Sequence, residues 1–187
     1  MPINFDLEEI RKKHDCTFFF ETGLYHGSGS KTALTCNFTK NFCIELRKDL
    51  VENGKNMFKN EIENGRYTIY LDDSSNLHKY ISNKNFKENK TIFFLDAHVD
   101  NQNISNYKQK CPLFDELEAI RLTERTDNII LIDDLRILKN NFPWGEKGYG
   151  NIDFISSIKN KILSINKNYK FDTLNGHVEN DVLLAYI

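Results

Sequence analysis

Long apolar runs are missing from this chain of 187 residues. No stretch approaches the roughly 18 consecutive apolar residues that a membrane-spanning helix needs. The first residues, MPINFDLEEIRKKHD, are charged and lack the apolar segment of a secretory signal peptide. We therefore expect a cytoplasmic protein with no membrane partner.

Paired cysteines are missing as well. The four cysteines show neither a C-x-x-C pair nor the spacing of zinc ligands. Cys16 and Cys43 fall in apolar segments, where cysteine usually behaves as a small buried hydrophobe. This pattern indicates a reducing compartment and argues against a disulfide-bonded scaffold.

A strong excess of one charge is also absent, because 25 Lys and Arg against 27 Asp and Glu leave a net charge of −2. The lysines are scattered among asparagines and form no basic stripe, so we expect no nucleic-acid partner. Hydrophobic residues make up 40% of the chain, which is too much for a disordered protein. The length predicts a single domain over residues 1–187.

The segment from residue 16 to residue 45 carries the most informative pattern. Its first part, Cys16–Phe20, is apolar without alternation, as in a strand that is buried on both faces. Glu21-Thr22-Gly23 ends this run, and Gly27 and Gly29 follow. Glycines allow a sharp bend and the close approach of a ligand. We therefore expect a strand that leads into a ligand-binding turn.

A helix and a second strand follow this turn. Ser28 and Ser30 are placed to cap the helix. The next apolar run, Phe42–Ile44, ends at Glu45, which lies 22 residues after Gly23. An acidic residue at about that distance can accept hydrogen bonds from ribose hydroxyls. The segment therefore predicts a nucleoside-binding βαβ unit.

The dinucleotide-binding fingerprint G-x-G-x-x-G is not met, because the glycines fall at positions 23, 27 and 29. Glu21 also places a negative charge where a pyrophosphate would lie. A cationic or zwitterionic ligand with an adenosine end suits the turn better. The alternative is a purely structural glycine turn in another α/β protein.

Apolar and helix-like segments alternate through the rest of the chain. We expect helices at 5–14, 47–60, 74–81, from Pro112 onward and at 152–165, and strands at 67–71, 91–95, 128–132, 169–173 and 181–187, the last two antiparallel. Polar connections are expected at 83–90 and 99–110, and an ordered loop over a site is expected at 135–150. This alternation predicts an α/β protein with a doubly wound, mainly parallel sheet.

Acidic residues stand at the carboxyl ends of the expected strands, where ligands bind in doubly wound sheets. This coincidence is the main functional indication in the sequence. The residues are Glu21, Glu45, Asp72-Asp73, Asp96 with His98, and Asp133-Asp134.

Together these motifs make the chain resemble the class I S-adenosylmethionine-dependent methyltransferases. The E-x-G-x-x-x-G turn at 21–27, Glu45 and Asp72-Asp73 match the general pattern. The segments LDAH at 95–98, CPLFDELEAI at 111–120 and IILIDD at 129–134 are similar to a group of small methyltransferase-like proteins of bacteria and viruses. The resemblance implies a Rossmann-like, seven-stranded sheet of order 3-2-1-4-5-7-6 with an antiparallel last strand.

The resemblance also implies a site for S-adenosylmethionine. Glu21 and Gly23 would line its methionine part, Glu45 would hold the ribose, and Asp73 or Ser74 would lie near the adenine. These roles fit the ligand, because a sulfonium and an ammonium favour nearby carboxylates and a ribose diol needs a bidentate acceptor. The full set of expected cofactor residues is Glu21, Thr22, Gly23, Tyr25, Gly27, Ser28, Glu45, Leu46, Asp72, Asp73, Ser74 and Asp96.

A metal site is the second expectation. Asp96, Asp133 and Asp134 end strands that are predicted to be adjacent, so their carboxylates could converge. Such a cluster suits Mg²⁺, Mn²⁺ or Ca²⁺, and the resemblance allows it. In the alternative interpretation, an Asp-Asp pair after a strand is only a turn and a helix cap.

Methyl transfer to a hydroxyl needs a base or a metal that lowers the pKa of the hydroxyl. We expect His98 to be a candidate general base beside the metal, Asp96 to be a further catalytic residue, and Arg136 to orient an anionic or polar acceptor. The alternative for His98 is a solvated or packing residue, which is the commoner role of a histidine in a loop.

Our first hypothesis is therefore an S-adenosylmethionine-dependent methyltransferase that acts on an oxygen of a small molecule or sugar, with or without a divalent metal. One alternative is an enzyme that consumes the cofactor or a nucleotide on the same scaffold without methylating an acceptor. Another is a non-catalytic nucleoside-binding module. The sequence leaves open the identity of the acceptor and whether the protein is a homodimer.

Overall fold

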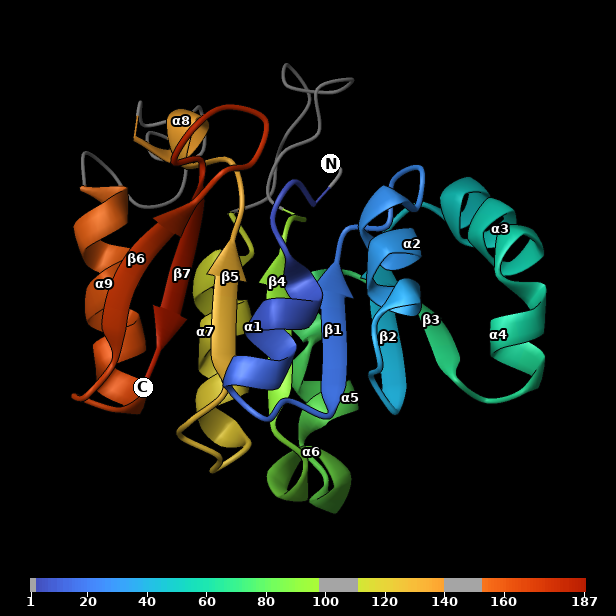
Figure 1. Cartoon of the computed structure of the whole chain (residues 1–187), viewed down its shortest axis with the longest axis horizontal. Coiled ribbons are helices and arrows are strands. Elements are labelled where there is room, and N and C mark those ends of the chain that lie inside the picture. The colour runs from blue at the N-terminus through green and yellow to red at the C-terminus, as the bar shows by residue number, and fades with distance from the viewer. Residues whose placement is uncertain (1–2, 98–110, 140–152) are drawn as a thin grey trace.

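The structure is a computed structural model that describes residues 3–97, 111–139 and 153–187. These residues form a seven-stranded sheet with helices on both faces (Figure 1). The strands lie in the order β3-β2-β1-β4-β5-β7-β6, which confirms the expected order. Their bounds are β1 (Phe18–Thr22), β2 (Lys40–Glu45), β3 (Tyr67–Leu71), β4 (Thr91–Leu95), β5 (Ile129–Ile132), β6 (Lys170–Leu174) and β7 (Val182–Tyr186).

The first five strands are parallel, and β7 is antiparallel to both of its neighbours, β5 and β6. Every residue of β1, β4 and β5 is buried, which explains why the apolar residues of these strands follow one another without polar alternation. The carboxyl ends of the parallel strands form the upper edge of the sheet in Figure 1. Because β7 runs the other way, its amino end lies at the same edge.

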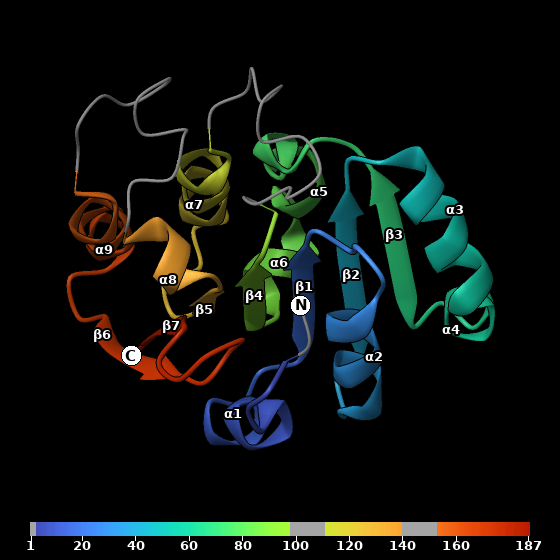
Figure 2. The ribbon, with the colours of Figure 1, turned by 90° about the horizontal axis from the view of Figure 1, so that it is seen from above.

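Helices cover both faces of the sheet. Figure 2 shows α1 and α2 on one face and α5, α7 and α9 on the other. The helix bounds are α1 (Leu7–Lys13), α2 (Ser28–Thr35), α3 (Lys48–Met57), α4 (Lys59–Glu63), the 3₁₀ helix η1 (Ser74–Asn76), α5 (His78–Ile81), α6 (Lys84–Glu88), α7 (Leu113–Leu122), α8 (Leu135–Leu138) and α9 (Phe154–Ile165). No helix in these ranges combines the length and the apolar character needed to cross a membrane.

The strand side chains alternate between two main cores. Phe20 and Phe93 pack in the core under α5, α7 and α9, whereas Phe19 and Phe94 pack in the core under α1 and α2. A third cluster joins β2 and β3 to α3 through Cys43, Ile69 and Val51. The same alternation decides which way each residue at the ligand edge points.

Some local expectations were wrong. Ser28 and Ser30 do not cap α2, because its N-cap is Gly27 in the left-handed conformation (φ +74°) and no side chain caps the helix. The connection at 83–90 contains α6, since the Asn83 side chain accepts from the amides of residues 85 and 86 and Phe86 is buried in the core. The expected helix at 74–81 is divided into η1 and α5.

The cysteines and the two expected loops complete the comparison with the sequence. Cys16, Cys36, Cys43 and Cys111 are all buried, which confirms the expected burial of Cys16 and Cys43. The polar loop at 99–110 lies outside the described residues, and so does most of the loop at 135–150. Within the latter, residues 135–138 form α8.

Candidate functional site

The turn between β1 and α2 lies at the edge where the parallel strands end. Gly23 adopts φ +84° and donates its amide to the carbonyl of Ile44 at 2.9 Å. A Cβ on Gly23 would lie 2.7 Å from the carbonyl oxygen of Asp96, so only glycine fits between β2 and β4. Because the chain crosses over in opposite directions on either side of β1, this turn stands at the topological switch point, where ligands of such sheets bind.

Glu45 holds this turn in place. Its Oε2 accepts the amides of Leu24 and Tyr25 at 2.9 and 3.1 Å, and its Oε1 accepts the amide of Arg47 at 2.8 Å. Tyr25 is left-handed (φ +47°), a conformation that needs such support. The carboxylate is therefore fixed beside the turn before any ligand arrives, and Oε1 keeps capacity for a further hydrogen bond.

Glu21 lies in β1, one residue before the strand ends, and faces α2. Ser30 Oγ donates to its Oε2 at 2.5 Å and is also hydrogen-bonded to the Tyr67 hydroxyl. A Cβ on Gly29 would lie 1.9 Å from Glu21 Oε1, so Gly29 makes room for this carboxylate. Burial raises the pKa of Glu21 to about 7 despite the hydrogen bond from Ser30. Its side chain is thus engaged inside the protein, and its predicted contact with a cofactor stays a prediction.

Asp72 and Asp73 follow β3 and shape the next turn. Burial opposes the ionisation of Asp72, but hydrogen bonds from Asn76, Tyr80 and Lys79 outweigh it and lower its pKa to about 2. Asp73 caps η1, because its Oδ1 accepts the amide of residue 75 at 2.9 Å. Asp73 therefore serves as a helix cap, and a ligand contact of Asp72 or Asp73 stays a prediction.

Three large apolar side chains remain exposed along this edge. Tyr25 lies in the β1–α2 turn, Leu46 follows β2 directly, and Leu71 ends β3. Each is about half exposed, at 49 to 53%. Glu45 pairs with Leu71 across the two strands, so Leu46 and Leu71 are neighbours at the edge. Exposed apolar groups in a row mark a surface that can bind an apolar or planar ligand.

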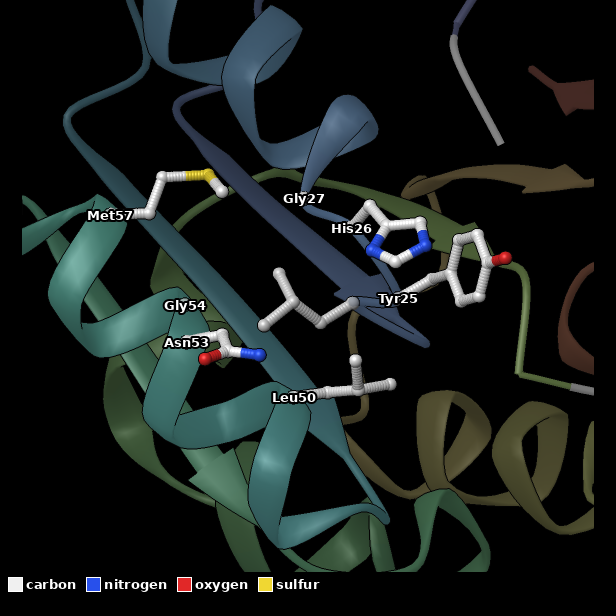
Figure 3. A pocket seen from close by; sticks show the side chains of 8 residues that line it. Tyr25, His26, Gly27, Leu50, Asn53, Gly54 and Met57 are labelled. Atoms are coloured by element: carbon white, nitrogen blue, oxygen red, sulfur yellow. The ribbon is translucent and has the colours of Figure 1, made fainter.

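A pocket of about 320 Å³ opens between the β1–α2 turn and α3. Figure 3 shows Leu50, Asn53 and Met57 projecting from α3 toward the turn that carries His26 and Gly27. Two expected cofactor residues, Tyr25 and Gly27, line this pocket, but none of the acidic residues at the strand ends does. The pocket thus adjoins the turn from the α3 side and is separate from the acidic cluster.

Asp133, Asp134 and Asp181 bring one carboxylate oxygen each to within 4.8 Å of one another, and all three are buried. Burial raises the pKa of Asp96 well above its usual range, and repulsion by Asp133 and Asp134 raises it further. Burial also raises the pKa of Asp133, against the hydrogen bond that it accepts from the amide of residue 134 at 2.7 Å. The structure therefore brings Asp133, Asp134 and Asp181 together, and Asp96 lies near enough to Asp133 and Asp134 for their charges to raise its pKa. The predicted part of Asp96 in a metal site stays a prediction.

Arg136 belongs to this cluster. Its Nη1 lies 2.7 Å from Asp134 Oδ1 and is also paired with Asp181 Oδ2, while its amide donates to Asp181 Oδ1 at 2.9 Å. The guanidinium thus offsets part of the negative charge of Asp134 and Asp181. Oxygen donors of this kind fit a hard divalent cation, although coordination by Asp134 would require Arg136 to release it.

The other expected residues have the following places. Thr22 is fully buried, and its Oγ1 accepts the amide of Asp96 at 3.2 Å. Ser28 begins α2 and is partly exposed, and Ser74 is buried at the start of η1. His98 lies outside the described residues.

Two buried acids were missed from the sequence. Asp181 directly precedes β7. The expected strand order could have indicated it, because an antiparallel strand beside β5 begins at the edge where the parallel strands end. Glu116 lies on α7. Its burial is harder to predict from the sequence, since a glutamate among apolar residues is common in an amphipathic helix.

Comparison with known proteins supports the architecture through structure and not through sequence. No family model matches the chain, and no curated protein matches it. An O-methyltransferase from Bacillus cereus in complex with S-adenosylhomocysteine is 13% identical, with a TM-score of 0.62 over 97% of this chain and 78% of that one. The O-methyltransferase TomG from Streptomyces achromogenes, in complex with S-adenosylmethionine, is 9% identical, with a TM-score of 0.63 over 97% and 77%.

A methyltransferase from Geobacter sulfurreducens is 16% identical, with a TM-score of 0.57 over 99% of this chain and 80% of that one. Identities this low establish a common fold and carry no residue roles. Nearly the whole chain takes part in each match, and the strand order is the same as that expected from the resemblance. The chain therefore has the Rossmann-like fold of the S-adenosylmethionine-dependent methyltransferases.

Proposed function

We propose that this protein is an S-adenosylmethionine-dependent methyltransferase that methylates an oxygen of a small molecule or sugar. The observation that carries the proposal is the placement of Glu45. Its carboxylate is fixed at the end of β2 beside the glycine turn, at the switch point of a sheet with the methyltransferase strand order. That is where a ribose diol would need its acceptor.

The neighbouring residues suit the rest of the cofactor. Leu46 and Leu71 offer exposed apolar surface next to Glu45, which fits a planar base. At the ends of β1 and β4, the buried carboxyl group of Glu21 and the partly buried one of Asp96 favour a cationic ligand such as a sulfonium. The net charge of −2 gives no reason to expect a nucleic-acid acceptor.

The acidic cluster would prepare the acceptor hydroxyl. Asp96, Asp133 and Asp134 are the residues that would hold a divalent cation, with Asp181 beside them. A bound cation would supply Lewis acidity that lowers the pKa of an acceptor hydroxyl. The chain's own part is to orient that hydroxyl at the carboxyl end of β4 and β5 and to accept its proton, for which His98 is the proposed base.

Calorimetry with S-adenosylhomocysteine tests the cofactor half of this proposal. We expect binding with measurable heat and a rise in melting temperature, because a ligand that binds only the folded state stabilises it. Transfer of a labelled methyl group from S-adenosylmethionine to a panel of phenols and sugars then tests the reaction. No heat and no thermal shift at millimolar ligand would rule out the proposal.

The substitution Asp133→Asn tests the metal half. We expect it to abolish Mn²⁺ binding, measured by electron paramagnetic resonance, and metal-stimulated activity, while S-adenosylhomocysteine still binds. Asp172→Asn, on the exposed side of β6, is the matched control and should behave as the wild type. Full wild-type activity in the presence of a chelator would show that the cluster holds no catalytic metal.

A further inference from the structure

Glu116, in the first half of α7, is fully buried. Within the described part of the chain, neither of its carboxyl oxygens has a hydrogen-bond partner in good geometry. Buried carboxyl groups are normally paired or hydrogen-bonded, because removing one from water is costly. Packing alone does not explain a glutamate at this position, because its carboxyl group is buried without a hydrogen-bond partner among the described residues.

The position of Glu116 links it to the proposed cofactor site. The hydroxyls of Ser74 and Thr22 lie close enough to favour its charged form. Ser74 begins η1 after β3, and Thr22 ends β1 directly before Gly23. Thr22 Oγ1 also accepts the amide of Asp96 at 3.2 Å. The carboxyl group therefore lies behind three segments that the proposed function assigns to the cofactor.

Burial and the neighbouring polar and charged groups together set the pKa of Glu116. Burial raises its pKa to about 7, the Ser74 and Thr22 hydroxyls lower it, and repulsion by Asp73 and Asp115 raises it again. Of the helices packed against α7, α9 supplies Lys161, but this lysine pairs with Glu118. His78 and Lys79 on α5 do not contribute to the shift, and Lys79 pairs with Asp72. A positive charge on a nearby ligand would therefore lower the pKa of Glu116 and favour its carboxylate form.

We propose that Glu116 is a specificity-determining residue that favours the sulfonium form of the cofactor over its neutral thioether product. The inference rests on the proposed function. When the sulfonium binds, the neutral Glu116 carboxyl loses its proton to solvent, and the resulting carboxylate stabilises the positive charge across a poorly solvated region. After methyl transfer the sulfur is neutral, so Glu116 takes up a proton and the product loses that stabilisation.

Calorimetry in buffers of different ionisation enthalpy tests this coupling, because it counts the protons released on binding. At pH 7 we expect the wild type to release more protons with S-adenosylmethionine than with S-adenosylhomocysteine, by up to about half a proton from this group. In Glu116→Gln the difference should shrink, and the affinity for S-adenosylmethionine relative to S-adenosylhomocysteine should fall several-fold. Glu118→Gln, on the exposed side of the same helix, should match the wild type.

The outcomes separate this inference from the proposed function. Unchanged proton counts and an unchanged affinity ratio in Glu116→Gln would overturn the role of Glu116 alone, whereas failure of the wild type to bind either ligand would overturn the proposed function. Should Glu116→Gln fail to fold, the wild type decides the question. Its affinity ratio should rise in favour of S-adenosylmethionine from pH 6 to pH 8, and a constant ratio would overturn the inference.

Discussion

Glu45 has one role that the structure shows and a second that we propose. It accepts three backbone amides of its own chain, and it stands where the ribose of the proposed cofactor would bind. The first role makes the second more effective, because an acceptor that is already fixed loses little freedom when the ligand arrives. The position of Glu45 at the strand end could be predicted from its distance to Gly23. Its bonds to Leu24 and Tyr25 could not, since they depend on the backbone angles of the turn.

The change Glu45→Ala should weaken S-adenosylhomocysteine binding by about 2 kcal/mol, or roughly 30-fold, because charge-assisted hydrogen bonds to the ribose are lost. It should also destabilise the protein, since the amides of Leu24, Tyr25 and Arg47 lose their acceptor. Titration calorimetry and urea unfolding measure the two effects separately. Glu52→Ala on the exposed side of α3 is the control, and an unchanged affinity in Glu45→Ala would place the ribose elsewhere.

At the scale of the elements, α8 shows how a short helix is held by a distant strand. Asp134 precedes it in the left-handed conformation and gives no side-chain cap. Asp181 supplies the missing acceptors, because its carbonyl accepts the amide of Leu135 at 2.8 Å and its Oδ1 accepts the amide of Arg136 at 2.9 Å. The helix therefore depends on the start of β7 for its first turn.

Replacing Asp181 by alanine should destabilise the protein by about 1–3 kcal/mol, since it leaves the Arg136 amide and guanidinium without this partner. Urea unfolding monitored by circular dichroism measures the loss. Asp172→Ala on exposed β6 should cost less than about 0.5 kcal/mol. Equal stability of the two variants would show that Asp181 does not anchor α8.

Most elements could be predicted because their signals are local. The strands at 67–71 and 91–95 coincide with β3 and β4, since unbroken apolar runs leave few alternatives. β1 begins two residues later than expected and includes Glu21 and Thr22, because α2 and α7 bury these polar residues. α6 was missed because five polar residues surround its anchor, Phe86, and only tertiary packing reveals that this side chain is buried.

At the scale of the whole molecule, the strand order could be predicted only through the resemblance, since nothing local says that β7 inserts between β5 and β6. The candidate site was predicted in part for the same reason. Asp96 and Asp133 directly follow the adjacent strands β4 and β5, which places both residues at the same edge of the sheet. The contacts of Arg136 with Asp134 and Asp181 depend on the three-dimensional arrangement, which no spacing in the sequence encodes.

The buried acids also predict how the stability of the ligand-free protein depends on pH. Folding raises the pKa of Glu21 and Glu116 from 4.5 to about 7, so the folded state binds more protons than the unfolded state between these values. Stability should therefore fall as pH rises from about 5 to 8, by up to about 3 kcal/mol for each group. Partial burial lowers the pKa of His14, which acts in the opposite direction, whereas the raised pKa values of Asp96 and Asp133 act in the same direction as those of Glu21 and Glu116.

Below about pH 4.5 the slope should reverse. Pairing with Arg11 lowers the pKa of Glu8 to about 2, and pairing with Arg121 and Lys161 does the same for Glu118, so their stabilisation is lost as they become protonated. Urea unfolding in chelator at pH 3 to 8 should give a maximum near pH 5. Glu21→Gln combined with Glu116→Gln should flatten the upper limb, and a steady rise from pH 5 to 8 in the wild type would contradict the prediction.

The insertion of β7 between β5 and β6 has a consequence for biosynthesis. β6 leaves the ribosome before β7, and among the described strands it pairs with β7 alone, so it must wait for the later strand before it can dock. Asp181 arrives with that same strand. A nascent chain that has already assembled β1 to β5 thus still lacks the carboxylate that pairs with Arg136, and the acidic cluster matures only when translation has passed the seventh strand.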